Sequence, residues 1–192
     1  MTARTTMSDL IQKLRVYTNA GANDFTVNST TYWTDEQLQD ELDKTQKKVN
    51  YQTMQAIPTY GVGGTATYTR YQTGLADWEK EPIIQNEGGT TLTAGTATGN
   101  YSFDDNIGVV IFVGDTEGHT RYITGYVYNV EMAAAKIWDQ KAALYATQFD
   151  FSTDNHSVKK SQVIMQCKDM ARYYQSRAGV FQVEMVRSDD VI

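Results

Sequence analysis

The stretch TDEQLQDEL at residues 34–42 contains the clearest helix start in this sequence. Thr34 and Gln37 have the spacing of a capping box, in which each side chain satisfies a free amide group of the first helical turn. The acidic residues between them suit the positive end of the helix dipole. An apolar stripe at helical spacing follows, made of Leu38, Leu42, Thr45 and Val49. The pattern therefore predicts a helix that runs from Thr34 to about Met54.

Three further segments show the same helical periodicity. The first is capped by Ser8 and the last is ended by Gly179, a residue suited to the left-handed conformation that closes many helices. The predicted helices cover residues 8–17, 129–149 and 157–178. Two helices therefore precede the middle of the chain, and two follow it.

The middle of the chain has a different composition. Pro58 ends the helical pattern, and short alternating runs separated by Gly and Asp follow it, which predicts an antiparallel β region. We therefore expect an α+β fold: a four-helix core bundle of two N-terminal and two C-terminal helices, with an inserted antiparallel β region and an extended C-terminal tail. The expected parts are a helical core at 1–57 and 129–178, a β-rich insertion at 59–128 and a tail at 179–192.

Charge is distributed unevenly along the chain, whose net charge is −6. Residues 58–128 carry 3 basic and 8 acidic groups, a net charge of −5, and residues 157–178 carry 5 and 1, a net charge of +4. The negative net charge argues against a protein that binds nucleic acid over a broad surface. An acidic surface could still line a channel through which DNA passes, because it repels phosphate. The basic helix is either a solvated face or an electrostatic contact for an acidic neighbouring subunit, through Lys159, Lys160, Lys168 and Arg172.

The single cysteine, Cys167, excludes a disulfide within the chain and lies on an apolar stripe, so we expect a buried small hydrophobe there. No apolar run reaches the roughly 20 residues needed to span a bilayer. We expect a soluble protein made in the cytoplasm, without a signal peptide. Met7 could serve as an alternative start, which would make residues 1–6 a ragged extension.

Catalytic patterns are scarce. Gly61 to Gly64 lacks the lysine and helix of a phosphate loop, so we expect a turn. His119 and His156 stand alone and are expected on the surface. No nucleophile and base can be paired, so we expect no enzyme, no catalytic residue and no cofactor.

One loop imitates a metal motif. Asp150, Ser152 and Asp154 alternate between two predicted helices, as in a calcium loop. The twelfth position, where an EF-hand has a glutamate, is Ser161, and the sixth is Asn155 rather than glycine. The loop therefore favours a fixed bend, in which the acidic residues shape the backbone and no metal binds.

Several stretches resemble one known family in the same order. Residues 33–43, WTDEQLQDELD, resemble the YTDEELQDALD segment of tailed-bacteriophage head–tail connector proteins. Residues 9–15, DLIQKLR, resemble their opening helix. Residues 133–138 and 149–154, AAAKIW and FDFSTD, resemble their later part, including members with a β insertion. The resemblance covers most of the chain, and the order of the motifs carries it.

This resemblance implies a structural virion protein with a helical core, a head-completion adaptor at the head–tail interface. Such proteins form a ring beneath the portal protein, usually of twelve subunits, contact the next connector or tail protein, and line the channel for genomic DNA. The family offers no catalytic residue to transfer and no membrane contact.

The tail and the β insertion have separate expected roles. The alternating tail would dock on the portal through Phe181, Val183, Met185 and Val186. The insertion either contacts neighbouring adaptors, the tail-side ring or the capsid, or faces the channel. The alternative function is a β-rich ligand- or carbohydrate-binding module of a phage particle, with Tyr68, Tyr71 and Trp78 as an exposed stacking platform.

Overall fold

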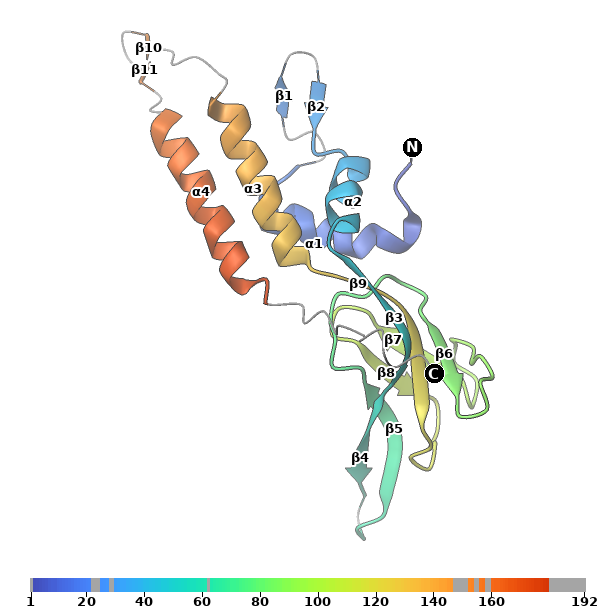
Figure 1. The fold of residues 1–192 in the computed structure, drawn as a ribbon. Coiled ribbons are helices and arrows are strands. Elements are labelled where there is room, and N and C mark those ends of the chain that lie inside the picture. Colours follow the sequence, from blue (N-terminus) through green and yellow to red (C-terminus); the bar gives the residue numbers. More distant parts are fainter. Residues whose placement is uncertain are drawn as a thin grey trace, which may run out of the picture.

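The computed structural model describes residues 2–21, 25–27, 30–61, 63–146, 152–153, 156–157 and 160–179. In these ranges a helical part and a β part lie at opposite ends of an elongated molecule (Figure 1). The helices are η1 (Thr5–Met7), α1 (Ser8–Thr18), α2 (Asp35–Asp43), α3 (Val130–Ala146) and α4 (Lys160–Arg177). The strands of the β part are β3 (Gln46–Thr53), β4 (Gln55–Tyr60), β5 (Ala66–Gln72), β6 (Ile83–Asn86), β7 (Tyr101–Asp104), β8 (Val109–Phe112) and β9 (Arg121–Tyr128). Two short pairs, β1 (Phe25–Val27) with β2 (Thr30–Tyr32) and β10 (Ser152–Thr153) with β11 (His156–Ser157), lie at the far end of the helical part (Figure 1).

The helical part is organised around α3. The helix α3 lies between α4 and the two N-terminal helices, α1 and α2 (Figure 1), and it buries small and apolar side chains such as Ala134 and Ile137. Its core cluster includes Leu14 of α1, Leu42 of α2 and Ile137 of α3, all fully buried. Asn129 caps α3 through a hydrogen bond from the backbone amide of Met132 and donates its side-chain amide to the Ala178 carbonyl, 2.5 Å away. The first turn of α3 is thereby tied to the end of α4.

The prediction of a four-helix core bundle is wrong. The helices α3 and α4 form an antiparallel hairpin, α1 crosses that hairpin rather than running along it, and α2 spans only nine residues (Figure 1). Contact between α1 and α4 includes the stacked rings of Tyr17 and Tyr174, whose centroids lie 5.3 Å apart. The arrangement is a mixed α+β fold in which a helical hairpin carries two shorter helices on one side.

The second predicted helix also ends early. The capping box at Thr34 and Gln37 is present as predicted, but α2 stops at Asp43 and residues 46–53 form the strand β3. Thr45 closes the helix by donating its hydroxyl to the Leu42 carbonyl. The stripe that continued to Val49 fits a strand equally well, and pairing with β9 decides in favour of the strand.

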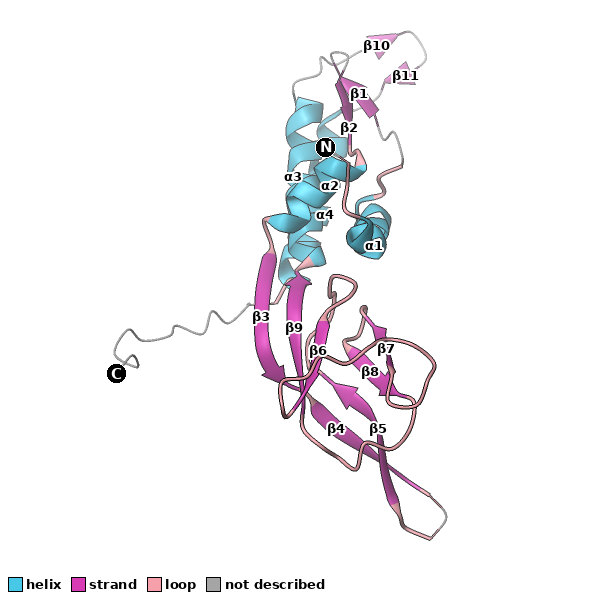
Figure 2. Cartoon of the chain, turned by 90° about the vertical axis from the view of Figure 1, so that its right-hand side faces the viewer, coloured by secondary structure: helices cyan, strands magenta, loops and turns pink. Residues whose placement is uncertain are grey.

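The β part consists of two antiparallel sheets, and the strands within residues 59–128 are antiparallel as predicted, whereas β3 and most of β4 lie before that range. One sheet has the order β3-β9-β6 and the other β4-β5-β8-β7. Both are visible below the helices in Figure 2. A second core cluster joins them, with Tyr71, Trp78, Ile84 and Ile123 fully buried. Only Met54 separates β3 from β4, so one stretch of backbone contributes an edge strand to each sheet.

No helix among the described residues is long and apolar enough to cross a membrane.

Candidate functional site

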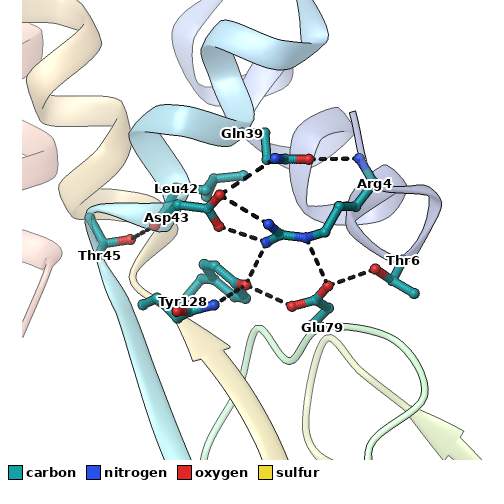
Figure 3. Close-up of polar contacts among 9 residues, drawn as sticks. Arg4, Thr6, Gln39, Leu42, Asp43, Thr45, Glu79 and Tyr128 are labelled. Carbon is teal, nitrogen blue, oxygen red and sulfur yellow. Dashed lines mark hydrogen bonds and ion pairs between the residues drawn. The ribbon is translucent and has the colours of Figure 1, made fainter. Parts of the chain in front are cut away.

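The helical and β parts meet at a polar junction centred on Arg4 (Figure 3). The Arg4 guanidinium donates to both Asp43 carboxylate oxygens at 2.7 and 3.1 Å, and to Glu79 at 3.2 Å. Its backbone amide donates to Gln39 at 2.6 Å. The pKa of Arg4 is raised, above all by the hydrogen bond to Asp43. One side chain near the start of the chain thus links the end of α2 to the loop that precedes β6.

Tyr128, the last residue of β9, extends the junction inward. Its hydroxyl donates to Glu79 and accepts from the Gln46 side chain, each at 2.7 Å. Thr6 donates to the other Glu79 oxygen at 2.6 Å. Burial, with the hydrogen bond to Glu79, raises the pKa of Tyr128. Both Glu79 oxygens are therefore held by donors from distant segments of the chain.

Two further ion pairs join α1 to the same loop. Lys13 contacts Asp77 at 2.5 Å, and Lys80 contacts Asp9 at 2.8 Å. Asp77 is almost fully buried, and burial raises its pKa against the opposing effect of Lys13. We refer to Arg4, Thr6, Asp9, Lys13, Asp43, Asp77, Glu79, Lys80 and Tyr128 as the junction.

The loop that carries these acids is itself held by close packing. Gly108, with φ +64°, sits where a Cβ would lie 2.0 Å from the Leu75 carbonyl oxygen and 2.9 Å from Trp78 Nε1. The Trp78 amide donates to the Asp105 carbonyl at 2.9 Å. The turn before β8 therefore fixes the loop against the β core.

The junction links the helical part to the β part through ion pairs and hydrogen bonds. Its cations contact its carboxylates directly, and its hydrogen-bond donors are directed at the same acids. In the ranges that the structure describes, no three His, Cys, Asp or Glu side chains group as metal ligands. Such an arrangement can hold two parts of a chain at a fixed angle.

The segment 4–6, which precedes Met7, takes part in the junction. Arg4 and Thr6 belong to the junction, and the Thr6 carbonyl accepts from the Lys80 amide at 3.3 Å. Residues 4–6 therefore contribute contacts that join the helical part to the β part. Nothing local in the sequence signals this, because the partners of Arg4 lie 39 and 75 positions away.

The basic face predicted on the last helix is partly described. Lys168 and Arg172 are exposed on α4, where Arg172 pairs with Asp169 at 3.3 Å. Lys160 is the first residue of α4, and Lys159 lies outside the described residues. The tail residues Phe181, Val183, Met185 and Val186 also lie outside them, as do Asp150 and Asp154 of the loop that resembles a metal site.

Other predicted residues have clear positions. Cys167 is buried as predicted, and burial raises the pKa of its thiol. His119 is on the surface as predicted, 3.7 Å from Glu117. Gly63 and Gly64 form the expected turn, at the tip of the β4–β5 hairpin.

The prediction that Tyr68, Tyr71 and Trp78 form an exposed stacking platform is wrong. Tyr71 and Trp78 are fully buried in the β core, where the Tyr71 hydroxyl meets Thr116 at 2.6 Å. Tyr51 and Tyr122 form an aromatic pair on the surface, and their rings stack with centroids 4.1 Å apart. Tyr51 is 47% exposed and has a positive φ at the irregularity in β3, so turn-like backbone within the strand places it outside.

The surface has two features that suit contact with other molecules. On α4, the exposed residues Met165, Lys168 and Arg172 recur at the spacing of one helix face, opposite buried Cys167. Next to the end of α4, a pocket of about 460 Å³ lies between Ala178 and Gly179, which follow the helix, and the start of β3, the end of β9 and the loop 74–77. Its lining includes Lys47, Leu75, Ala76, Val127, Ala178 and Gly179.

No family model, curated protein or solved structure matches this chain.

Proposed function

We propose that this chain is a structural virion protein: a head–tail adaptor that forms a ring, docks on the portal, connects the capsid to the tail and lines the DNA channel. The observation that carries the proposal is the exposed α4 stripe of Met165, Lys168 and Arg172, with Tyr173 beside it. Met165 is 64% exposed and Tyr173 48%, on a helix whose other face packs on α3. Apolar side chains among cations suit a neighbouring subunit with an acidic surface.

The acidic β part supplies a complementary surface. Residues 58–128 carry a net charge of −5 and include the exposed Glu81, Glu87 and Glu117. When the α4 stripe of one copy meets the β part of the next, the contact joins two different patches, and repetition closes a ring if the rotation permits. Acidic groups that remain toward the centre repel phosphate and reduce DNA sticking.

The junction supports the same role mechanically. A connector has to hold contacts at two ends in fixed register, and the ion pairs of the junction set the angle between the two parts of this chain. The tail residues Phe181, Val183, Met185 and Val186 are proposed to dock on the portal, and the next tail-side connector or tail protein binds at the opposite end.

Charge reversal on α4 tests the ring. We expect Lys168→Glu combined with Arg172→Glu to leave the fold intact and to abolish rings in negative-stain images of the protein with its portal. Lys47→Glu combined with Lys48→Glu, an exposed double change of the same kind outside both proposed surfaces, serves as the control and should keep the rings. Rings that persist in the double variant at physiological salt would remove the electrostatic contact from the proposal.

The second candidate is a β-rich ligand- or carbohydrate-binding module. The observation in its favour is the exposed Tyr51 ring stacked on Tyr122, since sugars bind to aromatic faces. Glycan-array binding that is lost in Tyr51→Ala would favour this candidate, and a closed ring with no glycan bound would favour the adaptor.

A further inference from the structure

The hairpin of β4 and β5 extends past the rest of its sheet (Figure 2). The strand β5 pairs with β8 only from Arg70 to Gln72. Further out, the Tyr68 carbonyl accepts from the Thr116 amide at 3.1 Å. Beyond Tyr68 the two strands pair with each other, and no third strand of the described chain pairs with them. The described residues past this point, which we call the tip, are Thr59, Tyr60, Gly61, Gly63, Gly64, Thr65, Ala66 and Thr67.

The tip has the composition of a contact surface. Residues 49–69 contain no charged side chain, although 21% of the whole chain is charged. Tyr60 is 69% exposed. Tyrosine is enriched at protein interfaces and charged residues are depleted at their centres, and tyrosine beside glycine gives a large, adaptable contact at low entropic cost. The tip therefore suits a partner surface that has apolar atoms and no unpaired charge.

The helical part carries a groove of about 1050 Å³ that lies between residues 2–5, α1 and the first residues of α2. Val16 lines this groove and is 69% exposed, so Val16 and Tyr60 are the two most exposed large hydrophobic side chains of the described residues. Pockets for small molecules hold about 300–1,000 Å³, so the groove has room for a tyrosine ring and the turn beside it. Its lining also includes Ala3, Ile11, Gln12 and Ala20.

The charged side chains that line the groove are bonded within the chain. Arg15 pairs with Asp35 at 2.6 Å, and Arg4 is held in the junction. Glu36 accepts hydrogen bonds from its own backbone amide and from Thr34 at the start of α2, which lowers its pKa. An inserted group does not need to supply a counter-charge, so the groove matches an uncharged insert such as the tip.

The tip and the groove lie at opposite ends of the molecule, so they cannot meet within one chain (Figure 1). We propose that the tip of one copy inserts into the groove of a second copy and places Tyr60 against Val16. Both halves of this contact are on the same chain, and each carries an exposed hydrophobic side chain that the other would cover. The contact joins two different patches, so it can be repeated from copy to copy.

This contact goes beyond the proposed adaptor role, because it uses neither the α4 stripe nor a portal. Like the proposed α4 contact, it joins the β part of one copy to the helical part of the next. A single hairpin tip buries less than the roughly 1,200 Å² of a stable interface, so the contact is weak between two isolated copies. It has to be tested at high protein concentration.

Cross-linking between two single-site variants tests the contact. Thr65→Cys places a thiol on the tip and Gln12→Cys places one in the groove, and both positions are exposed. The two full-length variants, one of them tagged, are mixed and treated with a short bismaleimide while Cys167 stays buried. We expect the mixed pair to link about tenfold faster than Gln12→Cys mixed with Ile111→Cys, a control that is exposed on β8.

A second change shows whether Tyr60 carries the contact. Adding Tyr60→Ser to the Thr65→Cys chain should slow linking to the rate of the control pair, because the aromatic side chain is lost from the groove. Tyr51→Ser removes another exposed tyrosine and should leave the rate unchanged. Both tyrosines are exposed, so neither change should unfold the protein.

Two results would overturn the proposal: equal linking rates for Thr65→Cys and Ile111→Cys, or linking that Tyr60→Ser leaves unchanged. The adaptor proposal fails separately. Linking that depends on Tyr60 in a chain that forms no ring on its portal would refute the adaptor and support the present contact. Rings together with linking that ignores Tyr60 would refute the present contact alone.

Discussion

Arg4 contacts Asp43 through two hydrogen bonds, so a residue near the start of the chain holds the last residue of α2. The same guanidinium reaches Glu79 in the β part. The segment around Arg4 therefore adds a polar link between the two parts, which are also joined covalently through β3 and β9.

Replacing Arg4 should weaken the junction. Arg4→Ala removes the contacts to Asp43 and Glu79 and leaves Glu79 with fewer donors, so we expect a loss of about 1–2 kcal/mol in the free energy of unfolding. Urea denaturation measures this loss. Thr2→Ala, an exposed change on the same segment, is the control. Equal stability of the two variants would mean that the ion pairs of Arg4 contribute nothing measurable.

Tyr128 should make the fold sensitive to alkali. Burial and the hydrogen bond to Glu79 raise the pKa of Tyr128 above its ordinary value of 10.0. Because the folded state holds this proton more tightly, the associated stability is complete below pH 10 and is lost as the pH rises from there through the pKa of the folded state.

The variant Tyr128→Phe separates this effect from others. At pH 7 it should be less stable by about 1–2 kcal/mol, because Gln46 and Glu79 lose a partner. Above pH 10 its stability should fall less steeply than that of the unmodified protein. Thermal melts across that pH range measure both effects, with the exposed Tyr60→Phe as control. Parallel curves above pH 10 would contradict the assignment.

Gly108 should tolerate no side chain. In Gly108→Ala the new methyl group meets the Leu75 carbonyl and Trp78, at a positive φ, and we expect a loss of about 3–5 kcal/mol. Gly89→Ala has a similar φ with open space around it, so only about 1 kcal/mol of backbone strain is expected there. Chemical denaturation of both variants isolates the steric contribution. Similar losses would show that the loop moves aside.

The apolar part of the α4 stripe should matter for assembly and not for folding. Met165→Asp changes an exposed residue, so its melting temperature should stay within a few degrees of the unmodified protein. Ring formation should fail, because a charge replaces buried apolar area at the proposed contact. Gln166→Asp, exposed on the same helix but about 100° around it from Met165 and away from Lys168 and Arg172, is the matched control and should assemble normally. Assembly by Met165→Asp would place the subunit contact elsewhere.

Local signals in the sequence predicted local structure well. The capping box at Thr34 and Gln37 involves residues three apart, and the hydrogen bonds that it implies are present at 3.0 and 3.4 Å. Burial of Cys167 followed from its position on an apolar stripe. The antiparallel strands of the middle region followed from alternation and turn residues.

The features that the sequence did not predict depend on contacts between residues far apart in the chain. Gln46 pairs with Tyr128, 82 positions away, and this pairing turns a stretch with helical spacing into β3. Tyr71 and Trp78 have the composition of a binding platform, but packing between two sheets buries them. The junction joins residues from four separate segments, and none of its members is unusual within its own segment.

The direct passage from β3 to β4 at Met54 has a mechanical consequence. Apart from a two-residue turn after α2 and Met54 between the strands, the backbone is extended from α2 to Tyr60 at the end of β4, and a second covalent path returns through β9 to α3. A force that stretches the molecule along its length is therefore carried by peptide bonds along both paths. Bending and twisting are resisted instead by the ion pairs of the junction, so covalent bonds limit the length of the molecule and side-chain contacts limit its angle.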